Sequence, residues 1–302
     1  MRSSGETDQA EGLRRLLVRN RTQVITVVSG KPGVGSTSVT INLAAALARS
    51  GKDVLVVDEN NAPGNLSDRL GLTAGHDLLD VARGKCVPAE AVLAAKGYSV
   101  LPAARAMSAL TALRQAEQER LEDALAEMGS GVDVVLVDAA TLSAKSVHST
   151  VSSSLASGGA LLVVADATAS GITESYALIK RLALESARAR FGVVVNRVTD
   201  AQAAKTAFEN MAQVARLNLA AQLDCLGYIP QDDKLKRAMQ LRRSVVEAFP
   251  AEPSAKAYQE LAQKLLCLPP QHDEAEGSAH AIIRGLMKSL RQCSGEMASV
   301  VN

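Results

Sequence analysis

Short runs of β-branched and aliphatic residues alternate with Ala- and Leu-rich stretches along most of the chain. The runs predict six strands, at residues 23–30, 53–58, 132–138, 160–166, 191–196 and 225–230. Nearly continuous apolar runs are typical of strands buried on both faces, as in a parallel sheet. Because these strands alternate with helical stretches, the pattern predicts a doubly wound α/β fold with a mainly parallel sheet and helices on both faces.

Polar residues and turn formers stand where each predicted strand ends. They are Gly30, Asp58, Asp138, Asp166, Asn196 and Pro230. Ligands of open α/β sheets bind at the carboxyl ends of the strands. We therefore expect the functional site at this edge.

The first predicted strand runs into the stretch SGKPGVGSTS, residues 29–38, and then into a helix predicted over 37–51. Glycines at 33 and 35 allow close backbone approach, and successive N–H groups at a helix N-terminus attract an anion. The hydroxyl of Thr37 is placed to contact Mg²⁺. The predicted nucleotide-binding residues of this loop are Lys31, Gly33, Val34, Gly35, Ser36, Thr37 and Ser38.

The loop by itself leaves a dinucleotide site open. Gly33, Gly35 and Ser38 nearly reproduce the dinucleotide fingerprint, and Asp58 stands about where a ribose-binding acid would lie. Asp138 instead ends an apolar strand, as a carboxylate near Mg²⁺ does in mononucleotide sites. The presence of Asp138 therefore favours a mononucleotide site over a dinucleotide site.

Composition narrows the class of protein. The chain has 302 residues, of which 47% are apolar and 22% charged, as expected of a packed globular protein. A net charge of +1, no Trp and 2% aromatic residues argue against direct nucleic-acid binding. Cys86, Cys225, Cys267 and Cys293 lack zinc-site spacing, which predicts reduced thiols in a cytoplasmic protein.

Several motifs together resemble one family. The loop 29–37 is similar to the deviant Walker A loop of the MinD/ParA ATPases, with Lys31 in the place of their signature lysine. Residues 166–180, 193–198 and 226–265 resemble the branch that regulates flagellar number, FlhG, also called FleN or YlxH. The similarity spans about residues 8–266.

The resemblance implies a regulator of flagellar number or placement that binds ATP or ADP with Mg²⁺ and forms a nucleotide-dependent homodimer. It implies that Lys31 reaches the partner's phosphates and that Asp138 acts on Mg²⁺ through water. Adenine would contact Asn196 and the segment from Pro230 to Asp232. Whether flagellar rotor proteins or transcription factors also bind is left open.

The chain departs from the family pattern at the residues of hydrolysis. Ser36 replaces a lysine, Asn60 replaces an aspartate, and Leu142 stands near the position of a glycine that senses the γ-phosphate. Pro32 also removes a backbone donor from the loop. These changes predict weak or lost ATP hydrolysis. Two alternatives are a nucleotide-independent adaptor and, more distantly, a dinucleotide-dependent oxidoreductase.

Two segments flank the predicted nucleotide-binding domain of residues 21–270. In residues 1–20, a helix is predicted from Asp8, with Glu11 in capping-box position. It would either pack on its own core or bind a partner. The second reading follows from a family motif that engages FlhF, a signal-recognition-type GTPase; the motif is matched by Asp8, Gln9, Ala10, Leu13 and Arg14.

Residues 271–302 comprise a polar linker and a predicted amphipathic helix. Its apolar face consists of Ile282, Ile283, Leu286, Met287 and Leu290, flanked by basic residues. Such a helix either docks on the domain or lies on an anionic membrane. The resemblance implies the second, at the inner face of the cell membrane.

Overall fold

The computed structural model describes residues 22–139, 159–186, 190–219 and 221–268. The predicted helices within 1–20 and 271–302, and Leu142, lie outside the described residues. None of the described helices is long and apolar enough to cross a membrane.

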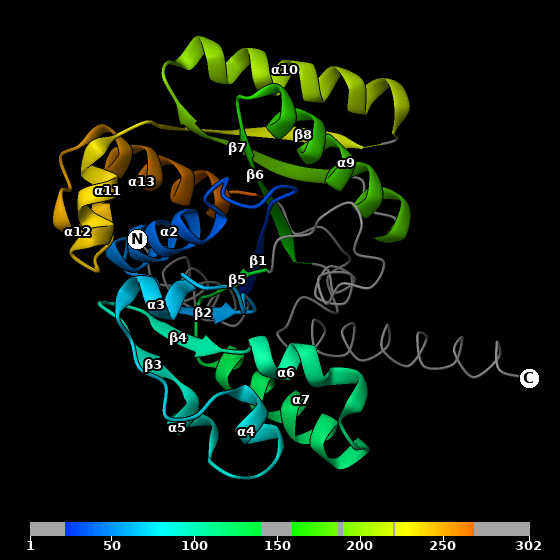
Figure 1. The fold of residues 1–302 in the computed structure, drawn as a ribbon, viewed down its shortest axis with the longest axis vertical. Helices are drawn as coiled ribbons and strands as arrows, with labels where there is room; N and C mark the ends of the chain where they lie inside the picture. Colours follow the sequence, from blue (N-terminus) through cyan, green and yellow to red (C-terminus); the bar gives the residue numbers. More distant parts are fainter. Residues whose placement is uncertain (1–21, 140–158, 187–189, 220, 269–302) are drawn as a thin grey trace, which may run out of the picture.

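The described residues form one eight-stranded sheet with the order β3-β4-β2-β5-β1-β6-β7-β8 (Figure 1). The strands are β1 Gln23–Val28, β2 Val54–Asp58, β3 Leu93–Ala94, β4 Ser99–Pro102, β5 Val134–Asp138, β6 Ala160–Asp166, β7 Arg190–Val198 and β8 Gln222–Pro230. Every pairing is parallel except that of β3 with β4. The predicted fold class is confirmed.

Helices cover both faces of the sheet. They are α2 Ser36–Arg49, α3 Leu66–Leu70, α4 Leu78–Ala82, α5 Pro88–Ala91, α6 Ala104–Ala109, α7 Gln115–Ser130, α9 Ala169–Ser186, α10 Ala201–Asn218, α11 Asp233–Gln240, α12 Val245–Ala248 and α13 Pro253–Leu266, with a 3₁₀ turn at Leu110–Ala112. Alternate strand residues enter different cores. Ile25 packs with α2 and α13, whereas its neighbour Val24 packs with α4, α6 and α7.

Helix α2 is buried on nearly all sides. Its residues 36–47 are buried because the sheet covers one side and α13 the other. The helix starts after Gly35, whose φ of +101° suits glycine, and ends before Gly51 at φ +84°. This burial fixes the position of the preceding loop relative to the strand ends.

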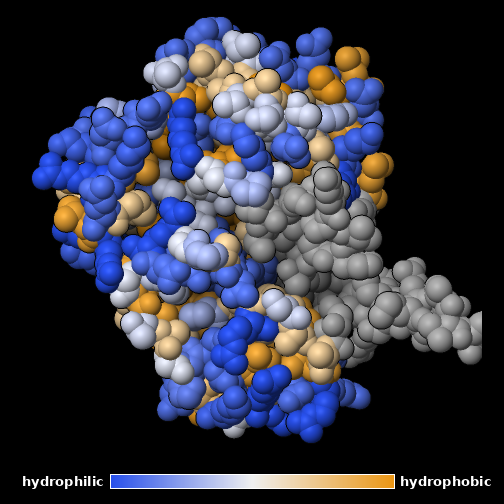
Figure 2. All heavy atoms as spheres, viewed as in Figure 1, coloured by the Kyte–Doolittle hydropathy of each residue, from blue (hydrophilic) through white to orange (hydrophobic). Residues whose placement is uncertain are grey.

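The surface gives no single large apolar area on the face drawn in Figure 2, where apolar residues form scattered groups among polar ones. The large exposed apolar side chains of the described residues are Val87, Leu184, Val214, Leu217, Tyr228 and Leu241. Val214 and Leu217 lie three positions apart on α10, and a few exposed apolar residues of this kind are common on soluble domains.

Candidate functional site

The loop between β1 and α2 is shaped as a cradle for an anion. Gly33 has a φ of +80°, and a Cβ atom there would meet nothing within 4 Å. At Gly35 a Cβ atom would come within 2.7 Å of the Asn196 Nδ2 atom. Gly33 thus faces open space, while Gly35 allows the loop to approach the end of β7 closely.

The first turn of α2 carries no competing group of its own. No side chain caps the helix, and its first turn holds no acidic residue. The first N–H groups of a helix lack intrahelical partners and attract negative charge. The uncapped helix behind an open glycine loop therefore fits a phosphate group.

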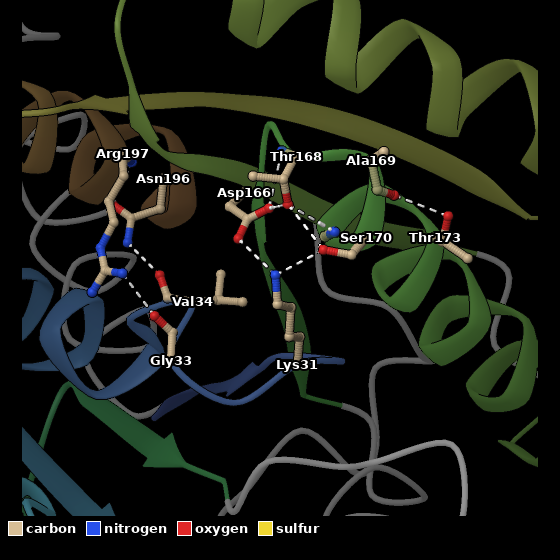
Figure 3. A network of polar contacts seen from close by, with 11 residues as sticks. Lys31, Gly33, Val34, Asp166, Thr168, Ala169, Ser170, Thr173, Asn196 and Arg197 are labelled. Atoms are coloured by element: carbon tan, nitrogen blue, oxygen red, sulfur yellow. Dashed lines mark hydrogen bonds and ion pairs between the residues drawn. The ribbon is translucent and has the colours of Figure 1, made fainter.

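Two consecutive residues of β7 hold the loop from one side (Figure 3). The Asn196 side-chain amide donates to the Val34 carbonyl at 2.8 Å, and the Arg197 guanidinium donates to the Gly33 carbonyl at 2.7 Å. Asn196 is buried, and its Oδ1 atom accepts from the backbone N–H of Arg197. Asn196, the predicted adenine contact, here positions the loop.

Lys31 contacts the start of α9 in the same chain (Figure 3). Its Nζ atom donates to the Ser170 hydroxyl at 2.9 Å and lies 3.6 Å from the Asp166 carboxylate. Asp166 also accepts from the backbone N–H of Thr168. The lysine is 35% exposed, so this ion pair contributes about 1 kcal/mol at most.

On the other side of the loop, the Thr37 hydroxyl lies within hydrogen-bonding reach of the Asp138 carboxylate, and both were predicted to lie near Mg²⁺. Asp138 is fully buried; Oδ1 accepts from the Thr40 hydroxyl at 3.0 Å, and Oδ2 has no hydrogen-bond partner. Asn60 donates to the Thr37 hydroxyl at 3.3 Å. An orphaned carboxylate oxygen beside a threonine hydroxyl suits a hydrated Mg²⁺.

The described residues contain no group of three or more His, Cys, Asp or Glu that could hold a metal by themselves. Mg²⁺ commonly binds through one or two carboxylates together with water and phosphate. The arrangement therefore fits a magnesium–nucleotide complex in which the protein supplies Asp138 and Thr37 near the metal.

Three buried carboxyl groups lie close together at the ends of β2 and β5. Burial raises the pKa of Glu59 to about 8, and the charges of Asp138 and Asp58 add to the effect. Burial likewise raises the pKa of Asp138 to about 7 and that of Asp58 to about 6. Backbone N–H groups of Asn60 and Leu66 hold Asp58 and partly offset its burial.

The remaining predicted residues lie around this centre. Ser36 is buried, and its hydroxyl lies 3.4 Å from that of Ser29, so a long and weak polar contact stands where the family has a lysine. Pro230 pairs with Val198, two residues beyond Asn196, so the predicted adenine segment starts beside the end of β7. Asp232 caps α11 through the N–H of Lys234 and accepts from the Ser254 hydroxyl.

Sequence reasoning missed three features of the site. Glu59 directly follows the predicted ligand Asp58. A charged residue directly after a buried strand is the signal that could have indicated it. Arg197 follows Asn196, but its place over the loop depends on an irregularity in β7. The contact of Lys31 with Asp166 and Ser170 joins positions with no common sequence pattern.

Known proteins resemble the chain in sequence and fold. The model of the CobQ/CobB/MinD/ParA nucleotide binding domain matches residues 25–245. The antiactivator FleN of Pseudomonas aeruginosa is 36% identical over 244 residues, which cover 80% of this chain and 86% of FleN. The flagellum site-determining protein YlxH of Helicobacter pylori is 25% identical and matches 82% of this chain and 83% of YlxH.

A solved structure of the septum site-determining protein MinD from Pyrococcus horikoshii OT3, complexed with Mg-ADP, shares the fold. The TM-score is 0.60 at 23% identity, with 81% of this chain and 96% of that chain covered. The family model, the relatives and the shared fold all agree with the anion-binding geometry of the loop. The chain belongs to the MinD/ParA family of nucleotide-binding proteins and, within it, to the FlhG/FleN branch.

Proposed function

We propose that this protein is a MinD-like regulator of flagellar number that binds ATP or ADP with Mg²⁺ and hydrolyses ATP weakly or not at all. The observation that carries the proposal is the uncapped N-terminus of α2 behind the open Gly33–Gly35 loop, in a chain of the FlhG/FleN branch. Backbone N–H groups supply much of the attraction for phosphate without a lysine at position 36.

Equilibrium binding of ATP, ADP and NAD in the presence of Mg²⁺ tests the nucleotide class. We expect micromolar or weaker binding of ATP and ADP, and no comparable binding of NAD. A Gly35→Ala variant should bind both nucleotides at least about 10-fold more weakly, because its φ is strained and its methyl group meets Asn196. Tighter binding of NAD would favour an oxidoreductase, and no binding at all would favour a nucleotide-independent adaptor.

We further propose that the nucleotide biases a homodimer in which Lys31 leaves its own chain for the partner's phosphates. The in-chain contacts of Lys31 support an exchange of this kind, because they are partly exposed and weak. Breaking them costs little compared with a charge-assisted bond to phosphate.

Partner binding is proposed for the N-terminal segment, on the motif of Asp8, Gln9, Ala10, Leu13 and Arg14. A peptide of residues 1–20 should raise GTP hydrolysis by an FlhF-type GTPase, whatever the state of this protein's own nucleotide site. The matched control is the same peptide with Leu13→Asp and Arg14→Glu. Equal rates with both peptides, and no stimulation by the full chain, would remove the FlhF partnership.

A further inference from the structure

Arg197 is displaced from the regular pattern of β7. The pairing of β7 with β8 shifts register between Asn196 and Val198, which leaves Arg197 as the extra residue of a bulge. Its φ is +57°, a left-handed conformation that only Arg197 and Arg242 adopt among the described residues other than glycine. Bulges near functional sites commonly turn one side chain in a new direction.

The bulge brings two consecutive side chains to the same side of the sheet. In a regular strand, Asn196 and Arg197 would point to opposite faces. Here they donate to successive loop carbonyls, those of Val34 and Gly33 (Figure 3). A strained residue with a defined polar contact is a reason to look for a function.

The guanidinium lies over the glycine loop and keeps an exposed surface. One N–H group binds the Gly33 carbonyl, and the Nη2 atom lies 3.5 Å from the position of a Cβ atom on Gly35. Arg197 as a whole is exposed. A planar cation fixed at one edge can still offer its face to an aromatic ring.

The sheet order separates this face from the magnesium side of the site. Asp58 and Asp138 end β2 and β5, which lie on one side of β1, whereas Arg197 comes from β7 on the other side. The loop that follows β1 stands between them. Arg197 is also next to Pro230, at the end of β8.

We propose that the Arg197 guanidinium is the platform on which the purine ring of the bound nucleotide stacks. The inference rests on the proposed function and assigns the base, not the phosphates, to this side chain. Stacking of an arginine on an aromatic ring contributes about 3- to 30-fold in affinity. The other role that this cation could serve, replacing the missing lysine of position 36 at the phosphates, is distinguished by the test.

The test compares calorimetric binding of ADP with Mg²⁺ and of inorganic tripolyphosphate with Mg²⁺. Arg197→Gly removes the guanidinium while relieving the positive φ, and Arg197→Lys keeps the charge without the planar group. Arg242→Gly is the matched control, because Arg242 has the same kind of backbone (φ +55°) and lies beside Gly71. Urea unfolding confirms that each variant folds.

We expect Arg197→Gly to weaken ADP about 10-fold and to leave tripolyphosphate within about twofold of the wild type. The affinity of Arg197→Lys for ADP should lie between those of Arg197→Gly and the wild type. Arg242→Gly should bind ADP as the wild type does. Equal weakening of both ligands would assign Arg197 to the phosphates, or to the loop that it holds through the Gly33 carbonyl, and in either case would overturn the platform. Unchanged ADP binding in Arg197→Gly would overturn it as well. A wild-type protein that binds no nucleotide would instead overturn the proposed function itself.

Discussion

Replacing Ser36 with lysine should tighten ATP binding about 10- to 100-fold, because a charge-assisted hydrogen bond to phosphate contributes roughly 1.5–3 kcal/mol. Ser36 is the first residue of α2, directly behind Gly35, so the new cation would start within the cradle. In the present chain the Ser36 hydroxyl accepts a long hydrogen bond from the Ser29 hydroxyl, at 3.4 Å. Titration with a nonhydrolysable ATP analogue measures the change.

The control for this variant is Ser36→Met, which adds a chain of similar length without charge. If Ser36→Met tightened binding as much as Ser36→Lys, packing rather than charge would explain the gain. Equal affinities in wild type and Ser36→Lys would mean that another cation already serves the phosphates.

Adding Asn60→Asp to Ser36→Lys should restore part of the hydrolysis. The Asn60 amide already lies 3.3 Å from the Thr37 hydroxyl, so a carboxylate there would stand beside the proposed Mg²⁺ position. A positioned base typically contributes about 10²–10⁴ in rate. The gain should stay at the low end, because Pro32 still lacks its N–H group. Phosphate release by the wild type at the rate of the double variant would contradict this account.

Glu59→Gln should make the protein less sensitive to alkaline pH. The folded protein keeps the Glu59 proton up to about pH 8, whereas an unfolded chain releases it at about pH 4.5. The stabilisation that comes from this retained proton is fully present below the pKa of Glu59 in the unfolded chain. It is lost as pH rises through the folded pKa of about 8. Between pH 6 and pH 9 the wild type should therefore lose about 2–4 kcal/mol more of its free energy of unfolding than Glu59→Gln does.

Urea unfolding in EDTA, without nucleotide, at pH 6, 7, 8 and 9 measures this difference. Glu260→Gln is the control, since Glu260 lies on an exposed part of α13 and should change nothing across this range. Because Asp58 and Asp138 share the cluster with Glu59, some slope will remain in Glu59→Gln. Parallel pH curves for wild type and Glu59→Gln would show that Glu59 is ionised in the folded protein at neutral pH.

The apolar runs predicted six strands and their parallel arrangement, because strands buried on both faces leave a continuous signal. The pattern missed β3 and β4, which are two and four residues long. Residues 99–102 read SVLP, too short a run to stand out from its surroundings. Boundaries moved by a few residues elsewhere: the strand predicted at 225–230 begins at Gln222, and the one at 191–196 ends at Val198.

The convergence of Gly33, Asp138 and Asn196 at one edge could be predicted, since parallel strands end at the same side of a sheet. The raised pKa of Glu59 could not be predicted, because it depends on how completely the surrounding chain excludes water. The direction of the Arg197 side chain could not be predicted either. The bulge depends on how β7 pairs with β8, and the pattern of polar and apolar residues along β7 does not reveal it.

The position of β1 in the middle of the sheet also bears on how the protein is made. Gln23 pairs with Val134, and Ile25 pairs with Ala160, so both neighbours of β1 are synthesised long after it. Contacts of such long sequence separation slow folding, since large loops must close before the contacts form. On the ribosome, every nascent chain that ends before residue 160 leaves at least one edge of β1 unpaired. Until then β1 exposes an unpaired strand edge, which is the kind of surface that favours aggregation during folding.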